Sequence, residues 1–355
     1  MALAFSHQPV IRWQWNSNED PFSSDQYDKE WCCYSDVETV IIEEAYQMNR
    51  AEAMLDDYHI DIKNMVQISN NSLNKQRPVK RMDDKNGELR LRPERFMPNP
   101  IFPAAPFLHE LDHRGGSFLR KVMVYLEVPD VSFPLRQSGI RRKVVEAAVD
   151  GLIVEGKKMG QQKIGEWLAG QLREVTTGTE KEVWACCARL YCMQSFLFEK
   201  LNEVMRLVGD QQHANFVKSK VSTLGPFALL LWRVAEYDRK QPKYSTVYRG
   251  ANLSDNLIDQ YREKCVGTTP YTSEKTFIFP AYTSTTLNRD KAEKYGNVLF
   301  IILTGRSGGW DMTPYSLFYY EEEVLLRPYF RFNIVSCEFD DTKDKWIIHL
   351  TSCGY

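Results

Sequence analysis

Three consecutive carboxylates near the end of the chain, Glu321, Glu322 and Glu323, run directly into the apolar stretch 324–326. In an extended strand successive side chains point to opposite faces, so we expect Glu321 and Glu323 on one face and Glu322 on the other. Two carboxylates one pleat apart can share acid/base work or can stabilise a developing cation. The structural alternative is a solvated strand start whose charges protect a sheet edge.

Two upstream segments carry further groups that suit charged or hydroxyl-rich ligands. The first is a short strand that ends in Arg249 and Gly250, a cation beside backbone that a ligand can approach closely. The second is a strand that ends in the hydroxyls of Ser284, Thr285 and Thr286. Each segment on its own is most often structural, so the functional interpretation depends on finding them together.

Composition permits two domains and excludes some functions. The chain has 355 residues, of which 43% are hydrophobic, and this is enough for two buried cores. Its formal net charge of −2 argues against a protein that binds nucleic acid along its whole length. The eight cysteines include the adjacent pairs Cys32-Cys33 and Cys186-Cys187 and form no CxxC motif, which indicates reduced thiols.

The same sequence shows no signal for export or for a membrane. Residues 1–7 lack a charged leader followed by an apolar core, so we expect no signal peptide. No stretch approaches the roughly 20 apolar residues that a membrane span needs. Together with the reduced thiols, these features predict an intracellular protein, cytoplasmic or nuclear, that does not contact a membrane.

Residues 109–113 read HELDH, which matches the HExxH pattern of zinc proteases in form. Zinc chemistry needs this pattern inside a stable helix, so that both imidazoles face one ion. Pro106 precedes the segment and two glycines follow it at 115–116, which leaves too little room for such a helix. We therefore predict an exposed polar turn and no metal.

The N-terminal part predicts a small sheet packed on one helix. Strand-like alternation of apolar residues marks segments 11–15 and 58–67, and the basic segment 75–81 predicts a final strand. In the first of them, Trp13 and Trp15 fall on one face. Ser35 and Glu38 form a capping box for a helix over 37–48.

This module resembles a WWE domain. The resemblance rests on residues in the order of the family: Trp13, Trp31, Glu43, Asp61, the tetrapeptide 64–67 and a basic last strand. It covers about residues 9–85, and we place the domain at 9–92. WWE domains are readers of ADP-ribose units, typically the iso-ADP-ribose joint of poly-ADP-ribose. The resemblance therefore implies a half-barrel sheet on one helix that binds ADP-ribose or its polymer.

The resemblance places four residues on ligand-contacting positions of the family: Trp15, Tyr58, Gln67 and Arg77. An aromatic face for adenine, an amide for a base edge and a guanidinium for phosphate suit that ligand. Trp15 stands where some binders carry tyrosine, Cys32 where they carry a second tryptophan, and Asn18 near a pocket arginine. The alternative is a protein-interaction module that has lost the ligand.

Residues 93–106 contain five prolines, which is the composition of a linker between domains. The segment 117–128 that follows predicts one strand, whose domain the sequence does not determine. We therefore assign 93–135 to a proline-rich linker with an uncertain strand.

The second half of the chain changes from helices to strands. From about 139 to 240 the pattern is helical, with a capping box at Thr179 and Glu182 and an apolar stripe that reaches Gly209. Beyond Tyr244 the pattern predicts short strands: 246–248, 276–284, 297–303, 322–327, 331–339 and 346–350. Helices first and strands second, without alternation between them, predict an α+β domain.

In this order and spacing, the three polar segments resemble the R-S-E class of mono-ADP-ribosyltransferases, which includes the cholera-toxin-like and the vertebrate arginine-specific enzymes. The matching residues are Arg249, Ser284 and the pair Glu321-x-Glu323. The resemblance covers about residues 136–355. It implies a domain with a helical N-terminal lobe and a two-sheet β core, which uses NAD as substrate and no metal.

The resemblance also implies a role for each residue in breaking the nicotinamide–ribose bond, which passes through an oxocarbenium-like cation. Glu323 would stabilise that cation, and Ser284 would orient Glu323 and the nicotinamide ribose. Arg249 would hold the diphosphate of NAD. Gly250 would offer its backbone to the nicotinamide amide.

Thr285 and Thr286 complete the hydroxyls expected to contact NAD, with Thr286 where the family's Ser-Thr-Ser ends in serine. Glu321 would position or deprotonate the guanidinium of an acceptor arginine, and the loop 318–320 would meet the acceptor protein. The chain then predicts a WWE module joined to a mono-ADP-ribosyltransferase, which is a glycosyltransferase. Two alternatives stay open: an NAD glycohydrolase that transfers poorly, and a catalytically silent ADP-ribose reader or scaffold.

Overall fold

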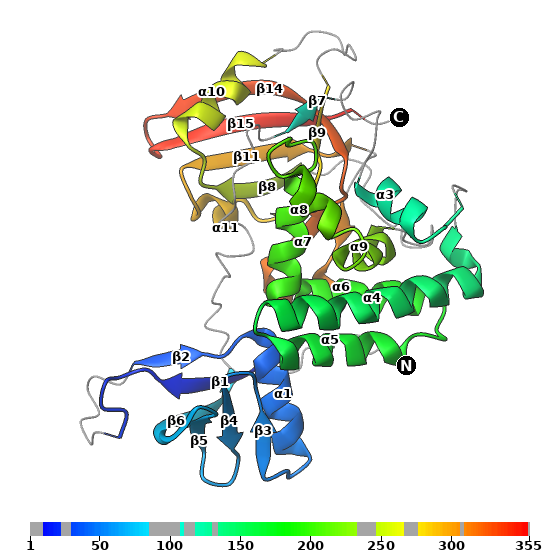
Figure 1. Cartoon of the computed structure of the whole chain (residues 1–355). Helices are drawn as coiled ribbons and strands as arrows, with labels where there is room; N and C mark the ends of the chain where they lie inside the picture. The colour runs from blue at the N-terminus through cyan, green and yellow to red at the C-terminus, as the bar shows by residue number, and fades with distance from the viewer. Residues whose placement is uncertain are drawn as a thin grey trace.

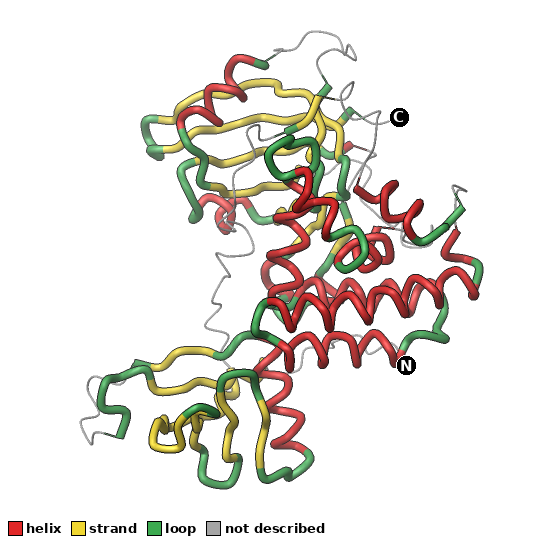
Figure 2. The backbone as a smooth tube through the Cα atoms, in the orientation of Figure 1, coloured by secondary structure: helices red, strands yellow, loops and turns green. Residues whose placement is uncertain are grey.

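The computed structural model of the chain describes residues 10–22, 30–84, 107–109, 118–129, 134–232, 246–265, 276–305 and 309–353. Figure 1 shows a small N-terminal sheet with one helix, a group of helices, and a larger C-terminal sheet. In Figure 2 most of the helices, in red, lie between the two groups of strands. This is the predicted α+β arrangement.

The N-terminal module is an antiparallel sheet in the order β2-β1-β6-β5-β4-β3. Its strands are β1 (Val10–Asn16), β2 (Trp31–Cys33), β3 (Glu52–Met54), β4 (Tyr58–Asp61), β5 (Val66–Ser69) and β6 (Ser72–Asp84). One helix, α1 (Asp36–Gln47), lies against the sheet. A buried cluster around Trp13, Ile42 and Ile60 joins helix and sheet.

Helix α1 begins at the predicted capping box. The Ser35 hydroxyl accepts the Glu38 backbone N–H at 3.3 Å, and the Glu38 carboxylate accepts the Ser35 backbone N–H at 2.9 Å. Glu43 then fixes the helix to the sheet, because it accepts hydrogen bonds from the Trp13 indole and from two nitrogens of Arg81. Burial raises the pKa of Glu43, but the bonds from its partners outweigh burial and lower the pKa overall.

The alternating stretch 58–67 forms two strands and not one. Strand β4 ends at Asp61, whose carboxylate accepts the Asn64 backbone N–H at 2.9 Å and closes a turn. Met65 has a positive φ of 54° in that turn. Alternation alone does not reveal the turn, because the apolar residues on either side of it keep the spacing of a strand.

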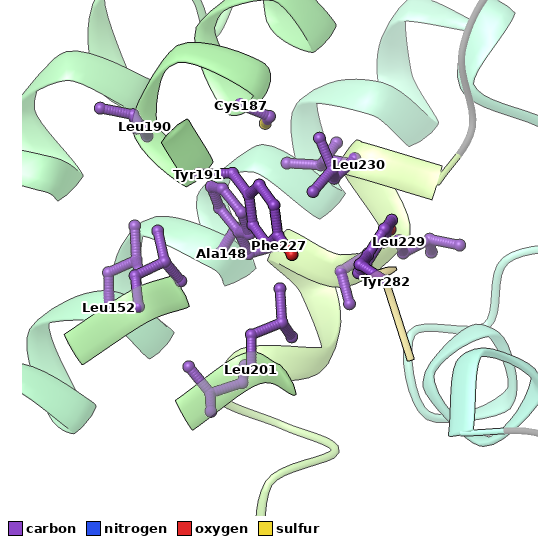
Figure 3. Packing of buried hydrophobic residues seen from close by; sticks show 14 of the residues in the cluster. Ala148, Leu152, Cys187, Leu190, Tyr191, Leu201, Phe227, Leu229, Leu230 and Tyr282 are labelled. Carbon is purple, nitrogen blue, oxygen red and sulfur yellow. The ribbon is translucent and has the colours of Figure 1, made fainter. Parts of the chain in front are cut away.

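Within the described residues, the middle layer consists of α3 (Phe118–Tyr125), α4 (Ser138–Lys158), α5 (Gln162–Glu174), α6 (Glu180–Cys192), α7 (Phe196–Arg206), α8 (Ala214–Ser219) and α9 (Leu224–Trp232). We call this layer the helical lobe. The predicted capping box is present at the start of α6, where Thr179 and Glu182 exchange two hydrogen bonds. Figure 3 shows the core of the lobe, where Tyr191, Phe227 and Tyr282 pack among leucines.

Residues 118–125 form helix α3, whereas the sequence predicts a strand over 117–128. The buried residues of α3 share one face of the helix: Phe118, Leu119, Val122 and Met123. They pack into the core of the helical lobe. The segment is too short for its apolar spacing to distinguish helix from strand, so contact with the lobe decides the outcome.

The C-terminal sheet has the strand order β12-β13-β10-β8-β11-β15-β14-β9-β7. Its strands are β7 (Leu108–His109), β8 (Thr246–Ala251), β9 (Phe277–Phe279), β10 (Thr283–Thr286), β11 (Val298–Leu303), β12 (Trp310–Asp311), β13 (Glu323–Leu326), β14 (Phe330–Asp340) and β15 (Lys345–Ser352). Two helices, α10 (Asp255–Glu263) and α11 (Arg289–Glu293), accompany them. The sequence predicts a core of two sheets, whereas these strands form one continuous sheet, which is narrowest between β10 and β8, where Thr286 opposite Tyr248 is the one registered pair.

Two boundaries differ from the prediction. The expected strand 276–284 is divided into β9 and β10 around Pro280, which has no N–H for a sheet ladder. Strand β7 pairs with β9, and Phe107 lies in the core of the C-terminal sheet, so 107–109 are part of that sheet and not of a linker. The proline-rich segment 93–106 lies outside the described residues.

Helix α1 also packs on the helical lobe, so the N-terminal module docks on the rest of the chain. Val37 is fully buried in the core of that lobe. Asp36 accepts the Gln194 backbone N–H at 2.7 Å, just before α7 begins. Asp56 accepts the Lys163 backbone N–H at 2.7 Å at the start of α5, where a carboxylate is favoured by unpaired N–H groups and the helix dipole.

Candidate active site and ligand pocket

Three of the predicted catalytic residues come from three neighbouring strands of the C-terminal sheet. Arg249 lies on β8, Ser284 lies on β10 and Glu323 begins β13. Thr286 pairs with Tyr248 on one side and with Glu323 on the other, which places the three strands side by side. A nitrogen of the Arg249 guanidinium donates to the Ser284 carbonyl oxygen at 2.6 Å.

Glu321 does not lie on a strand, contrary to the sequence prediction. Residues 319–321 form one turn of 3-10 helix, Glu322 adopts a left-handed conformation with φ 49° and ψ 43°, and β13 begins only after it. Glu321 and Glu323 are both buried, with 0% and 1% of their surface exposed, whereas the Glu322 side chain is 45% exposed. The expected division of the three carboxylates is present, but a tight turn produces it and not strand alternation.

The hydroxyls of Thr285 and Thr286, which the sequence assigned to NAD contact, bond within the protein. Thr285 donates to the Val324 carbonyl oxygen at 2.6 Å, and Thr286 donates to the Glu321 carbonyl oxygen at 2.7 Å. Both side chains are fully buried. Thr286 thus supports the turn that carries Glu321, and Thr285 supports β13.

The Ser284 hydroxyl differs from its neighbours, because it is buried and has no hydrogen-bond partner among the described residues. An unsatisfied buried hydroxyl costs about 1–3 kcal/mol, so it favours a partner beyond the described residues, such as a ligand. A ribose hydroxyl is a group of the required kind. This residue therefore fits the NAD that the sequence predicts here.

Arg206, at the end of α7, adds a second positive charge that the sequence analysis did not select. Burial, followed by the charge of Arg206, lowers the pKa of Arg249 to about 10. Burial also lowers the pKa of Arg206 itself. Two like charges held near one another suit an anion with more than one charge, such as a diphosphate. Arg206 lies between apolar positions of the predicted stripe, and only the folded structure brings it to Arg249.

Packing within the chain gives Gly250 a structural reason to be a glycine, whatever ligand its backbone meets. A Cβ at this position would lie 2.3 Å from the Ala292 carbonyl oxygen and 2.6 Å from the Tyr295 carbonyl oxygen. The protein's own backbone thus approaches this glycine closely. The glycine lets β8 pack against α11, which ends just before Tyr295.

The predicted ligand residues of the N-terminal module lie together on its sheet. Gln67 on β5 lies directly opposite Arg77 on β6, and the Arg77 guanidinium lies 5.4 Å from the centre of the Trp15 ring. Tyr58 lies on β4, which pairs with β5. Tyr34, which the sequence analysis did not select, donates its hydroxyl to the Gln67 side-chain oxygen at 2.6 Å, and its ring lies 6.0 Å from that of Tyr58.

The polar groups of this pocket are held in fixed orientations. The Tyr58 hydroxyl donates to Glu38 at 2.9 Å. Burial, followed by the charge of Glu38, raises the pKa of Tyr58, so the phenol stays protonated. Arg77 donates to the Asn16 and Asn18 carbonyl oxygens at 2.9 and 2.7 Å. Asn18, a departure from the expected pattern, therefore orients the pocket arginine through its backbone.

The HExxH match contributes no described site. Its first residue, His109, lies on β7, and residues 110–113 lie outside the described part of the chain. Among the residues that the structure describes, no group of His, Cys, Asp and Glu could hold a metal ion. Over the same residues, no helix is both long and apolar enough to cross a membrane.

Two family models match the chain in separate places. One, described as WWE domain, matches residues 11–81, and the other, described as NAD:arginine ADP-ribosyltransferase, matches residues 180–355. The chain carries a WWE domain followed by an ADP-ribosyltransferase domain. The order and the position of the two domains agree with the sequence prediction. The second domain is of the NAD-dependent class, whose substrate is NAD.

Three similar solved structures are bacterial proteins. The type III effector XopAI of Xanthomonas axonopodis pv. citri is 12% identical, with 66% of this chain and 91% of that chain covered and a TM-score of 0.43. The ADP-ribosyltransferase HopU1 of Pseudomonas syringae pv. Tomato DC3000 is 18% identical, with 59% and 95% covered and a TM-score of 0.37. Exoenzyme S from Pseudomonas aeruginosa, in complex with human 14-3-3 protein beta and bound to Carba-NAD, is 17% identical, with 59% and 88% covered and a TM-score of 0.35. No curated protein sequence matches the chain. The domain assignment therefore rests on the two family models.

Proposed function

We propose that the catalytic domain cleaves the nicotinamide–ribose bond of NAD and transfers ADP-ribose to an arginine side chain of an acceptor protein. The observation that carries the proposal is the tight turn that buries Glu321 and Glu323 at the strands of Arg249 and Ser284. Such a turn supplies one carboxylate for the bond that breaks and a second for the acceptor.

Cleavage requires stabilisation of a cation that forms only in the transition state. As the C–N bond breaks, its electron pair goes to the nicotinamide nitrogen and positive charge develops on the ribose. Glu323 supplies the opposing negative charge from a buried position at the start of β13. A fixed charge in a site that excludes water stabilises the cation more than a charge in solution does.

NAD is positioned by groups on either side of Glu323. In this proposal Arg249 and Arg206 bind the diphosphate, which relieves their mutual repulsion. The unsatisfied Ser284 hydroxyl bonds the nicotinamide ribose. The backbone of Gly250, the next residue along β8, meets the nicotinamide amide. The bond from Arg249 to the Ser284 carbonyl oxygen keeps the phosphate and ribose contacts in register.

Transfer requires removal of a proton from the acceptor guanidinium as it attacks the ribose. A guanidinium is a poor nucleophile, because its lone pairs are delocalised and its pKa exceeds about 12. Glu321 pairs with the acceptor guanidinium and takes its proton as the new N–C bond forms on the ribose. Tyr319, which is 41% exposed, lies in the same 3-10 turn and offers a surface to the acceptor protein.

For the WWE domain we propose binding of ADP-ribose or poly-ADP-ribose. Trp15 and Tyr58 supply aromatic faces for adenine, and Gln67 supplies an amide for the base edge. The bonds from Arg77 to backbone carbonyls use only one of its two terminal nitrogens. Because a guanidinium has five N–H donors, the others can contact phosphate. All eight cysteines are free thiols, which fits action inside the cell, in the cytoplasm or the nucleus.

Hydrolysis of NAD by water is the competing reaction. A buried second carboxylate favours transfer, because water needs no proton acceptor of this kind when it attacks an oxocarbenium-like cation. A silent reader or scaffold would need neither the buried Glu323 nor the unsatisfied Ser284 hydroxyl.

Incubation of the full chain with labelled NAD and an arginine-rich protein acceptor tests the catalytic proposal. We expect label on the acceptor together with release of nicotinamide. Release of nicotinamide without labelled acceptor would assign an NAD glycohydrolase. Neither product would leave an ADP-ribose reader or a scaffold.

A further inference from the structure

A short segment, 285–291, holds the turn that carries the two carboxylates. The Thr286 hydroxyl bonds the Glu321 carbonyl oxygen in the turn, the Thr285 hydroxyl bonds Val324 just after it, and the Leu287 backbone N–H bonds the Glu322 carbonyl oxygen at 3.1 Å. The last contact comes from Lys291 on α11. Its amine bonds the Tyr320 carbonyl oxygen and lies 2.6 Å from a carboxylate oxygen of Glu322.

Glu322 is the residue at which the chain changes direction between the 3-10 turn and β13. Its left-handed backbone is a conformation that a residue with a Cβ rarely adopts, and it persists only where its surroundings hold it. The holding contacts on its side chain come from Lys291 and from the Asn288 amide at 3.4 Å. Since Glu322 separates Glu321 from Glu323, its conformation sets the direction of one carboxylate relative to the other.

The helix that carries Lys291 is itself fixed to the active-site strands. Asn288 caps α11 by accepting the Lys291 backbone N–H at 3.2 Å, and its own backbone N–H donates to the Thr286 hydroxyl oxygen at 3.0 Å. On the other side, the Ala292 carbonyl oxygen packs against Gly250. Lys291 therefore connects β10 and β8 with the turn through short contacts.

The two carboxylates depend on this support to different degrees. Glu323 belongs to β13, which has four registered pairs with β10, so strand pairing fixes it without Lys291. Glu321 lies outside the strand, and its backbone is held by the turn, where its N–H bonds the Phe318 carbonyl oxygen at 2.9 Å, and by the Thr286 hydroxyl on its carbonyl oxygen. The Lys291 side chain is 18% exposed, so its contacts are partly shielded from water, unlike those of an exposed ion pair that contributes little.

We propose that Lys291 is a positioning residue that orients Glu321 towards the acceptor and thereby sets the ratio of transfer to hydrolysis. The inference rests on the proposed transferase function. Lys291 acts through Glu322 and the Tyr320 carbonyl group, and it takes no part in proton transfer.

Lys291→Met in the full chain tests this role, because it removes the charge and the donors and keeps an unbranched side chain. We expect transfer to an arginine-rich peptide to fall about tenfold or more, since misplacement of a reacting group by about 1 Å can cost 10²-fold. Nicotinamide release and the KM for NAD should change by less than about twofold, because Glu323 and the NAD contacts stay in place.

Three further variants separate positioning from a general effect on the fold. Lys294→Met changes an exposed lysine at the end of the same helix and should leave both rates unchanged. Glu322→Ala removes the partner of Lys291 and should lower the transfer-to-hydrolysis ratio as Lys291→Met does. The exchange Lys291→Glu with Glu322→Lys restores an ion pair and should recover part of the lost transfer.

The outcomes distinguish failure of the Lys291 inference from failure of the proposed transferase function. Equal falls in transfer and nicotinamide release, or an unchanged ratio in both Lys291→Met and Glu322→Ala, overturn the inference and leave the transferase function standing. A wild-type chain that releases no nicotinamide overturns both. Unfolding temperatures are measured throughout, and if Lys291→Met unfolds well below the wild type, the ratio in Glu322→Ala decides.

Discussion

Arg206 at the end of helix α7 and Arg249 on strand β8 carry guanidinium charges that repel each other, because burial and, after it, the charge of Arg206 lower the pKa of Arg249. Burial also lowers the pKa of Arg206. In the proposed function, the diphosphate of NAD pairs with both arginines and removes this repulsion, which favours a diphosphate over a single phosphate.

Arg206→Gln is expected to weaken NAD binding. Loss of one charged hydrogen bond costs on the order of 1.5–3 kcal/mol, so the KM for NAD should rise about tenfold or more while the rate at saturation changes less. Steady-state nicotinamide release measures both quantities. Lys218→Gln, which changes an exposed lysine on α8, is the control. An unchanged KM in Arg206→Gln would show that this arginine serves only the fold.

The affinity for NAD should depend on pH in the alkaline range. Because the pKa of Arg249 is lowered to about 10, its guanidinium is charged below that pH and loses its charge as the pH rises through it. NAD binding should therefore weaken as the pH rises through this value. Arg206→Gln removes the like charge and should move the loss to higher pH. Tryptophan fluorescence titrations with NAD between about pH 8 and about pH 11 test the shift, and a constant Kd over that range would contradict it.

Glu323→Gln keeps the size of the side chain and removes the charge that faces the cation. We expect nicotinamide release to fall about 10²-fold or more, as for the loss of other groups that stabilise transition-state charge. The Kd for NAD, measured by calorimetry, should stay close to that of the wild type. Near-normal turnover of NAD would show that the cleavage site lies elsewhere.

Glu321→Gln should separate transfer from hydrolysis. Modification of an arginine acceptor should be abolished, because the guanidinium keeps its proton, while release of nicotinamide stays measurable. Labelled NAD with and without acceptor gives both rates. Survival of both activities would make Glu321 a structural residue, and loss of both together would place it in the NAD site.

Gln67→Leu tests the WWE pocket with a side chain of similar size that lacks the amide. Affinity for ADP-ribose should fall about tenfold, since one net hydrogen bond contributes about 1 kcal/mol and the Tyr34 hydroxyl also loses its partner. Calorimetry on the full chain measures it, with Lys63→Ala in the exposed β4–β5 turn as the control. If the wild type gives no heat with any form of ADP-ribose, the domain is a protein-interaction module.

Features that depend on neighbouring residues in the chain could be predicted from the sequence. Both capping boxes, Ser35 with Glu38 and Thr179 with Glu182, stand at the start of helices, because their hydrogen bonds join residues three apart. The strands that carry the candidate catalytic residues were also located, since short apolar runs that end in polar groups mark them in the sequence.

Features that depend on distant contacts could not be predicted. The left-handed turn at Glu322 contains no glycine, and Lys291, one of the residues that hold it, lies 31 positions earlier in the chain. Arg206 comes from a helix whose end meets β8 only in the folded protein. Val37 reads as part of the core of its own module, but it lies in the core of the helical lobe.

The docking of α1 on the helical lobe, through Val37 and the Asp36–Gln194 contact, governs how a bound target meets the active site. A domain on a flexible linker lets its target sample a broad volume, at an effective concentration set by the length of the linker. A docked domain instead holds its target at a fixed direction and a fixed distance from the active site. Under the proposed functions, a target held by ADP-ribose on the WWE domain would present an arginine at that distance to Glu321 at high effective concentration, and nearer or farther arginines would not reach it. The choice of the modified arginine would then follow from spacing along the target.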